Sequence, residues 1–216
     1  MKIALKAAAF AAVAALAATA GGSAQAAVNV TFTSTDAGLP AGQQMVWDFD
    51  GVEGAGYGVS FTAGSGPRAV AAGSSSDAAP PPGATGFYAA VLGGGEMLLT
   101  TPGIAALSFF MGSPDNYNSI RFNYSDGSFD TLTGIELAAG AFNGDQSIGR
   151  RMTYQFEKSV TSVLFSSSQN SFEFDNIATL SSAVPEPATW AMLIAGFGLA
   201  GSAIRSRRQK AALALA

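Results

Sequence analysis

The feature that most constrains the fold of this chain is the alternation of apolar with other residues in its central part. Period-two alternation buries one face of a β-strand and leaves the other face toward solvent. The alternating segments are short, Gly, Pro and Asn separate them, and no sustained helical period occurs between them. The segments are 28–32, 45–49, 57–61, 107–111, 120–124, 152–156, 161–165 and 172–174.

This pattern predicts an all-β fold of about ten short strands, arranged as an antiparallel β-sandwich or jelly roll. The clearest predicted hairpin covers residues 120–137, and Ser125-Asp126-Gly127-Ser128 forms its turn. Residues 73–86 have few apolar side chains to bury, so we expect a surface loop there. The chain contains no Cys, so packing alone must hold this domain together.

The N-terminus has the organisation of a secretory signal peptide. Lys2 and Lys6 precede an apolar stretch at residues 7–20, and an Ala-x-Ala cleavage site follows. The residues that define the predicted cleavage site are Ala24, Ala26 and Ala27. The apolar stretch is too short to span a membrane, so we expect removal of this segment during export.

A second apolar segment lies near the C-terminus. Residues 188–204 carry no charge, and at about 1.5 Å per residue they reach the short end of what spans a bilayer. The basic cluster that follows favours the cytoplasmic side of a membrane, which places the preceding domain outside. A permanent membrane anchor is one interpretation of this segment.

The residues around that segment also resemble the PEP-CTERM sorting signal in its Pro-Glu-Pro-x-x-Trp-Ala variant. The resemblance rests on Pro185, Glu186, Pro187, Trp190, Arg205, Arg207 and Arg208. It implies recognition by an exosortase, a membrane transpeptidase that cuts at the Pro-Glu-Pro site and releases or attaches the upstream protein at the cell surface. It also implies a non-enzymatic surface or extracellular-matrix protein linked to exopolysaccharide and biofilm.

The sequence therefore predicts five parts and a route of export. The parts are a signal peptide (1–26), a β-sandwich domain (27–180), a linker with the PEP motif (181–187), a transmembrane helix (188–204) and a basic cytoplasmic tail (205–216). The expected partners are the secretion machinery and signal peptidase, the exosortase, the membrane and exopolysaccharide. The expected route passes through the inner membrane to the cell surface or matrix. Residues 27–184 carry five basic and fourteen acidic residues, a net charge of −9, which disfavours nucleic acid as a partner.

The composition excludes several kinds of chemistry. The chain has no His and no Cys, which removes Ser-His-Asp and Cys-His nucleophiles and the usual zinc sites. Lys158 and Ser159 are neighbours in a predicted strand and point to opposite faces, so they do not form a catalytic dyad. We expect neither enzymatic activity nor a cofactor.

The acidic residues near the predicted turns leave one alternative open. Asp and Asn commonly cap turns, but a structural Ca²⁺ at the edge of the sandwich is the other use of these side chains. They are Asp48, Asp50, Glu53, Asp115, Asn116, Asp126, Asp175 and Asn176. Two alternatives for the whole protein also stay open, a lectin-like carbohydrate-binding module and a permanently anchored surface protein. Tyr57, Tyr88, Tyr117 and Phe129 are the aromatic residues considered for sugar stacking.

Overall fold

A computed structural model describes residues 28–33, 38–62, 64–112, 115–139, 149–182, 192–202 and 205. Within these residues the chain forms ten strands, one 3₁₀ turn and one short helix before a C-terminal helical stretch at 192–202. The elements are β1 (Asn29–Thr33), β2 (Gln44–Trp47), β3 (Gly58–Phe61), β4 (Gly66–Ala69), η1 (Val70–Ala72), β5 (Phe87–Val91), β6 (Gly95–Met111), β7 (Asn118–Tyr124), β8 (Phe129–Thr133), α1 (Gly134–Leu137), β9 (Arg150–Ser167) and β10 (Phe172–Ser181).

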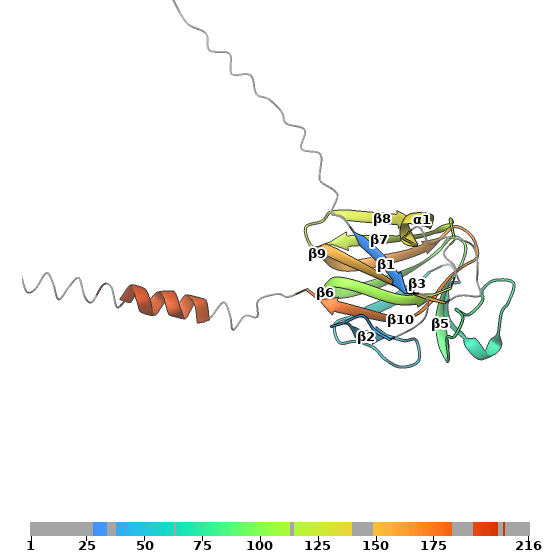
Figure 1. Ribbon diagram of the computed structural model, residues 1–216, viewed down its shortest axis with the longest axis horizontal. Coiled ribbons are helices and arrows are strands. Elements are labelled where there is room, and N and C mark those ends of the chain that lie inside the picture. Colours follow the sequence, from blue (N-terminus) through green and yellow to red (C-terminus); the bar gives the residue numbers. More distant parts are fainter. Residues whose placement is uncertain are drawn as a thin grey trace, which may run out of the picture.

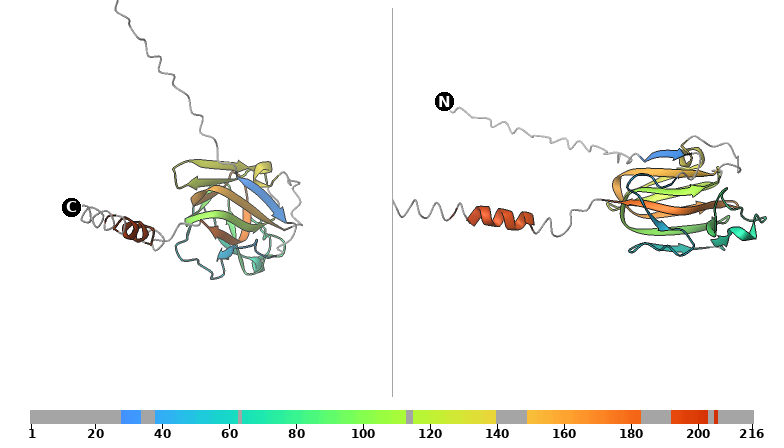
Figure 2. Two further views of the ribbon diagram at one scale, coloured as in Figure 1. Left: turned by 60° about the vertical axis from the view of Figure 1, so that its left-hand side comes forward. Right: turned by 60° about the horizontal axis from the view of Figure 1, so that its bottom comes forward.

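All the strand pairs are antiparallel, and they form two packed layers (Figures 1 and 2). The first layer has the order β3, β6 (95–100), β9 (160–167), β7, β8. The second layer has the order β1, β9 (151–155), β6 (104–111), β10, and then β2 and β5 end to end, with β4 outside β5. The predicted antiparallel all-β fold is thereby confirmed.

Two long strands, β6 and β9, pass from one layer to the other. Their pairing shifts register between Thr100 and Ile104 and again between Ile104 and Ala106. Pro102 lies at this shift, and a proline inside a strand cannot donate a ladder hydrogen bond, so strands bend or bulge there. The two segments predicted as separate strands at 152–156 and 161–165 are therefore one strand, because the bend interrupts the alternation without ending the pairing.

Aromatic side chains from both layers form the core. Phe165 of the first layer stacks on Phe174 of the second at 4.5 Å between ring centroids, and it meets the edge of Phe109 at 5.5 Å. Phe122 contacts Tyr154 across the layers at 5.3 Å. All five of these side chains are fully buried, with 0% exposure. The described helical residues 192–202 are exposed, so they add nothing to this core.

The hairpin between β7 and β8 has its turn at the predicted Ser125-Asp126-Gly127-Ser128. Gly127 has φ of +84° and donates its N–H to the Tyr124 carbonyl at 3.1 Å. This backbone conformation is accessible to glycine without the steric cost that a side chain would bring.

The remaining predictions have mixed outcomes. Strands β4 and β5 were not predicted, because their small residues lack a clear alternation. Residues 73–86 form no strand, but Ala78 is buried, so the segment is not wholly on the surface. The signal peptide and the Pro-Glu-Pro residues lie outside the described residues. Among the described residues, no helix has the length and apolar character needed to cross a membrane.

Candidate functional site

The C-terminal sorting segment is the first candidate site, and only part of it is described. In the helical stretch 192–202 the apolar side chains face solvent, with Phe197 and Leu199 each 72% exposed. Apart from the helix's own backbone and the adjacent residues, no atom lies within 4 Å of the positions that a Cβ on Gly196, Gly198 or Gly201 would occupy. Arg205 is helical and exposed. The other predicted residues, Ala24, Ala26, Ala27, Pro185, Glu186, Pro187, Trp190, Arg207 and Arg208, lie outside the described residues.

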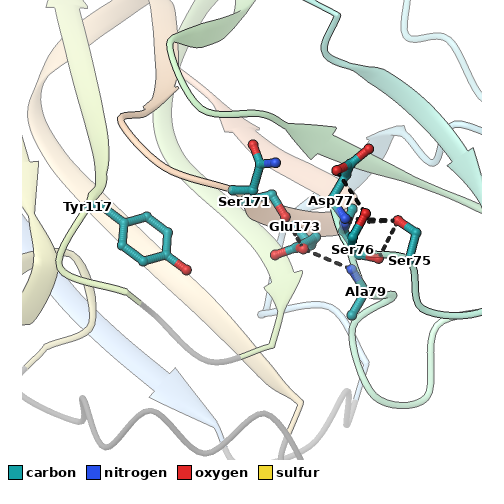
Figure 3. A pocket seen from close by; sticks show the side chains of 9 residues that line it. Ser75, Ser76, Asp77, Ala79, Tyr117, Ser171 and Glu173 are labelled. Carbon is teal, nitrogen blue, oxygen red and sulfur yellow. Dashed lines mark hydrogen bonds between the residues drawn. The ribbon is translucent and has the colours of Figure 1, made fainter.

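A second candidate is a polar pocket at the end of the sandwich where β10 begins. We call it the Glu173 pocket; its volume is about 140 Å³. Figure 3 shows Tyr117 on one side and the 75–79 turn on the other, with Ser171 and Glu173 between them. The residues that line it are Ser75, Ser76, Asp77, Ala78, Ala79, Tyr117, Asn170, Ser171 and Glu173.

Hydrogen bonds fix both walls of the Glu173 pocket. The Ser75 hydroxyl oxygen accepts the N–H of Ala78 at 3.1 Å, which closes the turn. The next residue, Ala79, donates its N–H to Glu173 Oε1 at 2.9 Å and so ties the turn to β10. Ser171 donates its hydroxyl to the same Glu173 oxygen. The Ala79–Glu173 bond therefore joins two segments that are far apart in the sequence, while the other two bonds fix each segment locally.

The pocket also perturbs its ionisable groups. Burial raises the pKa of the Glu173 carboxyl, and the hydrogen bonds from Ser171 and Ala79 oppose that rise only in part. Burial, together with a hydrogen bond to the Asp115 carboxylate, raises the pKa of the Tyr117 hydroxyl. Burial also raises the pKa of Asp115. The uncharged forms of these groups are thus favoured relative to the same groups in water.

A larger cleft lies beside the Glu173 pocket and shares Tyr117 with it. We call it the Asn118 cleft; its volume is about 440 Å³. The side chain of Asn118 is 1% exposed, and among the described residues its Nδ2 has no hydrogen-bond partner. The residues that line the cleft are Gly94, Gly95, Glu96, Asn116, Tyr117, Asn118, Ser119, Thr133, Ser166, Ser167 and Ser168.

The acidic residues considered for calcium do not converge. Asp48 Oδ1 accepts the N–H groups of Asp50, Gly51 and Val52 at 2.8 to 3.0 Å, so it caps its own loop. Asp50 accepts the Phe87 N–H at 2.9 Å. Among the described residues, no group of three or more acidic side chains could hold a metal ion.

Lys158 also has a structural partner. Its Nζ lies 2.8 Å from Asp126 Oδ2 and 3.2 Å from the Ser128 hydroxyl, at the hairpin turn. The Ser159 hydroxyl instead contacts the Ser182 hydroxyl at 3.0 Å. The two neighbours therefore have separate partners, as their places on opposite faces of β9 require.

Comparison with protein-family models finds the PEP-CTERM protein-sorting motif at residues 183–208. The chain carries a PEP-CTERM sorting motif. The match includes the Pro185-Glu186-Pro187 sequence, Trp190 and the arginines that follow the apolar segment. PEP-CTERM proteins are exported and sorted to the cell surface, and the motif implies an exosortase as the processing partner.

Solved structures and curated sequences add little to this identification. One similar structure is a family 11 carbohydrate-binding module from Clostridium thermocellum, solved in complex with a β-1,3-1,4-mixed-linked tetrasaccharide. It is 17% identical, with a TM-score of 0.32, and the alignment covers 67% of this chain and 98% of the module. A similarity this low carries no information on ligands. No curated protein matches the chain.

Two of the residues that line the cavities, Asn116 and Tyr117, are among the candidates that the sequence indicates, the first for calcium and the second for sugar stacking. The sequence does not group Glu173, Ser119 or Ser166 with them. The residues come from strands β6, β7, β8, β9 and β10 and from the loops between strands, and their grouping depends on strand order. A single sequence without that order holds no signal that would join them.

Proposed function

We propose that this protein is a non-enzymatic surface or extracellular-matrix protein that an exosortase cleaves at its Pro-Glu-Pro sequence. The observation that carries the proposal is the sorting motif at residues 183–208, which follows directly after the sandwich ends at Ser181. The upstream domain is then the part that reaches the surface. Exopolysaccharide and biofilm are its proposed setting.

The composition and the pockets support a non-enzymatic role. The chain has no His or Cys, and the Lys158 ammonium is held at a hairpin turn by Asp126. The half-buried Glu173 carboxyl is held by the Ala79 N–H and the Ser171 hydroxyl, which is the kind of arrangement that secures a loop. These groups therefore have structural partners that account for their positions.

The test of this proposal is the intact mass of the mature protein from its native host. The parent is compared with a variant in which Pro185, Glu186 and Pro187 are all replaced by Ala. We expect the parent to begin near Ala27, to end close to Pro187 and to lack the segment from Trp190 onward, and we expect the variant to keep that segment. If both proteins keep the full tail, the exosortase proposal is wrong and permanent anchoring replaces it.

A second candidate function is a carbohydrate-binding module on the same exported domain. It is favoured by one observation, the pair of cavities that share Tyr117 and are lined by hydroxyl, amide and carboxyl side chains. Sugar sites combine hydroxyl and amide side chains with an aromatic ring, and both kinds of group are present there. Sorting and binding are compatible, since they use different parts of the chain.

A further inference from the structure

We propose that the Asn118 cleft and the Glu173 pocket together bind an extended, uncharged saccharide chain. The proposal rests on the second candidate function and gives it a site and a ligand class. It is independent of tail cleavage, because every residue that it uses belongs to the sandwich. The features that support it are a row of polar side chains, the aromatic ring of Tyr117 and a lining that contains no basic side chain among the described residues.

The row of side chains crosses four neighbouring strands. In the pairing register, Glu96 of β6 faces Ser166 of β9, Ser166 faces Ser119 of β7, and Ser119 faces Thr133 of β8. All four residues line the Asn118 cleft. We call them the hydroxyl row. Neighbouring strands lie about 4.8 Å apart, so the row presents polar groups at regular intervals over roughly 15 Å. The interval between neighbouring groups, about 4.8 Å, is close to the length of one hexose unit in an extended glycan.

Three of the four residues in this row, Ser119, Ser166 and Thr133, carry a hydroxyl group. Ser119, Ser166 and Thr133 make no side-chain hydrogen bond to another described residue, and Thr133 precedes α1 without capping it. The side chain of the neighbouring Asn118 belongs to the buried face of β7, where its Oδ1 accepts the Ser167 hydroxyl at 2.8 Å, so it is not part of the row. Ligand hydroxyls, which both donate and accept, could pair with the Ser119, Ser166 and Thr133 hydroxyls in place of water.

Tyr117 lies where the cleft meets the Glu173 pocket, and it lines both. Its carbonyl oxygen accepts the Ser168 N–H at 3.0 Å, and the next residue, Asn118, donates its N–H to Asp115 at 3.1 Å. The backbone of Tyr117 is therefore fixed from both sides. An aromatic ring held in this way offers an apolar face to a sugar ring at little entropic cost.

The charges around the two cavities favour an uncharged ligand. Among the described residues that line them none is basic, while Asp77, Glu96 and Glu173 are acidic. Arg121 lies near the row, but its guanidinium covers the Phe129 ring at 3.7 Å and its Nε donates to Asn123 Oδ1 at 3.0 Å. An anionic sugar would meet like charge here without a paired cation, which costs binding free energy. The acidic groups do not form a metal cluster among the described residues.

Isothermal titration calorimetry of the full chain tests the proposal, in micelles of a detergent without a sugar headgroup. The probes are cellotetraose, laminaritetraose and maltotetraose, with tetragalacturonate as the anionic comparison and CaCl₂ alone as the cation comparison. We expect saturable binding of at least one neutral tetrasaccharide and no binding of tetragalacturonate. No saturable binding of any neutral probe overturns the proposal, as does preferential binding of tetragalacturonate.

Matched variants then locate the site. The combined change Ser119→Ala, Ser166→Ala and Thr133→Val removes hydroxyls and keeps the shape, and we expect it to weaken binding at least about tenfold. Its control is Thr131→Val, on the same face of β8 but outside the cleft, which we expect to change affinity by less than about twofold.

The ring and the carboxyl have their own variants. Tyr117→Ala should weaken binding about tenfold, whereas the exposed-aromatic control Phe129→Ala should leave it unchanged. If the Ser119, Ser166 and Thr133 variant binds like the parent while its melting temperature is also unchanged, the site is elsewhere. Calcium binding that Glu173→Gln abolishes makes the pocket a cation site and likewise overturns the proposal. None of these outcomes depends on whether the tail is cleaved.

Discussion

Phe165 gives the sharpest prediction about what holds the sandwich together. Its side chain is fully buried, stacks on Phe174 at 4.5 Å and also contacts Phe109 and Phe172 at 5.5 and 6.0 Å. Phe→Ala in a core costs about 3 to 5 kcal/mol, and each aromatic pair adds about 0.5 to 1.5 kcal/mol beyond its buried area. Since three pairs are lost at once, we expect Phe165→Ala to fall at the upper end, near 5 kcal/mol.

The assay is urea unfolding of residues 27–182, followed by tryptophan fluorescence. Trp47 is the sole tryptophan of that segment, because the other is Trp190, and it packs against the core. The matched control is Phe129→Ala, because Phe129 is 52% exposed and its main contact is the Arg121 guanidinium. An exposed cation–π contact is worth about 0.5 to 1 kcal/mol, so the control should lose no more than that.

A result in which the two variants lose similar free energy would refute this reasoning. It would mean that the two layers are not joined through Phe165, or that the core relaxes fully around the missing ring. The slope of free energy against urea must stay constant between variants for the comparison to hold. A changed slope would indicate a different unfolded state or loss of two-state behaviour.

Three further predictions follow from individual contacts. Burial raises the pKa of Glu173 above the ordinary 4.5, so the folded state binds more protons than the unfolded state and loses stability as pH rises through that raised pKa. Melting curves between pH 4 and 8 should therefore show that the stability of Glu173→Gln increases relative to that of the parent as the pH rises. Arg151→Ala removes the hydrogen bonds that a fully buried guanidinium donates to the Ser108 hydroxyl and to the Asn176 carbonyl. The free energy of unfolding in urea should fall by about 3 kcal/mol, and an unchanged unfolding midpoint would contradict this prediction. Gly86→Ala places a side chain at a residue with φ of +72°, against the Asp50 carboxylate, so we expect the free energy of unfolding to fall by about 2 kcal/mol. Gly83→Ala, which also has a positive φ but has open space around it, is the control for the strain in the backbone, and thermal melting of both variants measures the difference.

The fold could be predicted because its strands obey a local rule. Inward residues such as Phe122 and Phe165 alternate with outward ones, and that alternation needs no knowledge of the partner strand. The bend in β9 could not be predicted, because the register shift depends on pairing with β6 around Pro102. Strand β5 was missed for a related reason. Its buried residues include Ala89 and Ala90, and small side chains carry little signal of burial.

The sites divide in the same way. The sorting signal is contiguous in sequence, so Pro185, Glu186 and Pro187 could be identified without any structure, and the family match covers them. The hydroxyl row is the opposite case. Ser119, Thr133 and Ser166 are ordinary residues of outward strand faces, and only the order β6, β9, β7, β8 brings them into one line.

The topology of β10 relates the two kinds of site to each other. The Glu173 pocket lies at the start of this strand, and the chain leaves the sandwich after its last residue, Ser181. Eight residues of extended strand separate the two points by roughly 25 Å, which spans the sandwich from one end to the other. Residues 166–168 at the end of β9 and Asn118 at the start of β7 lie at the same end as Glu173. Attachment through the C-terminal segment would therefore hold the sandwich by the end opposite the two cavities, and a saccharide chain could reach them whether or not the tail has been cut.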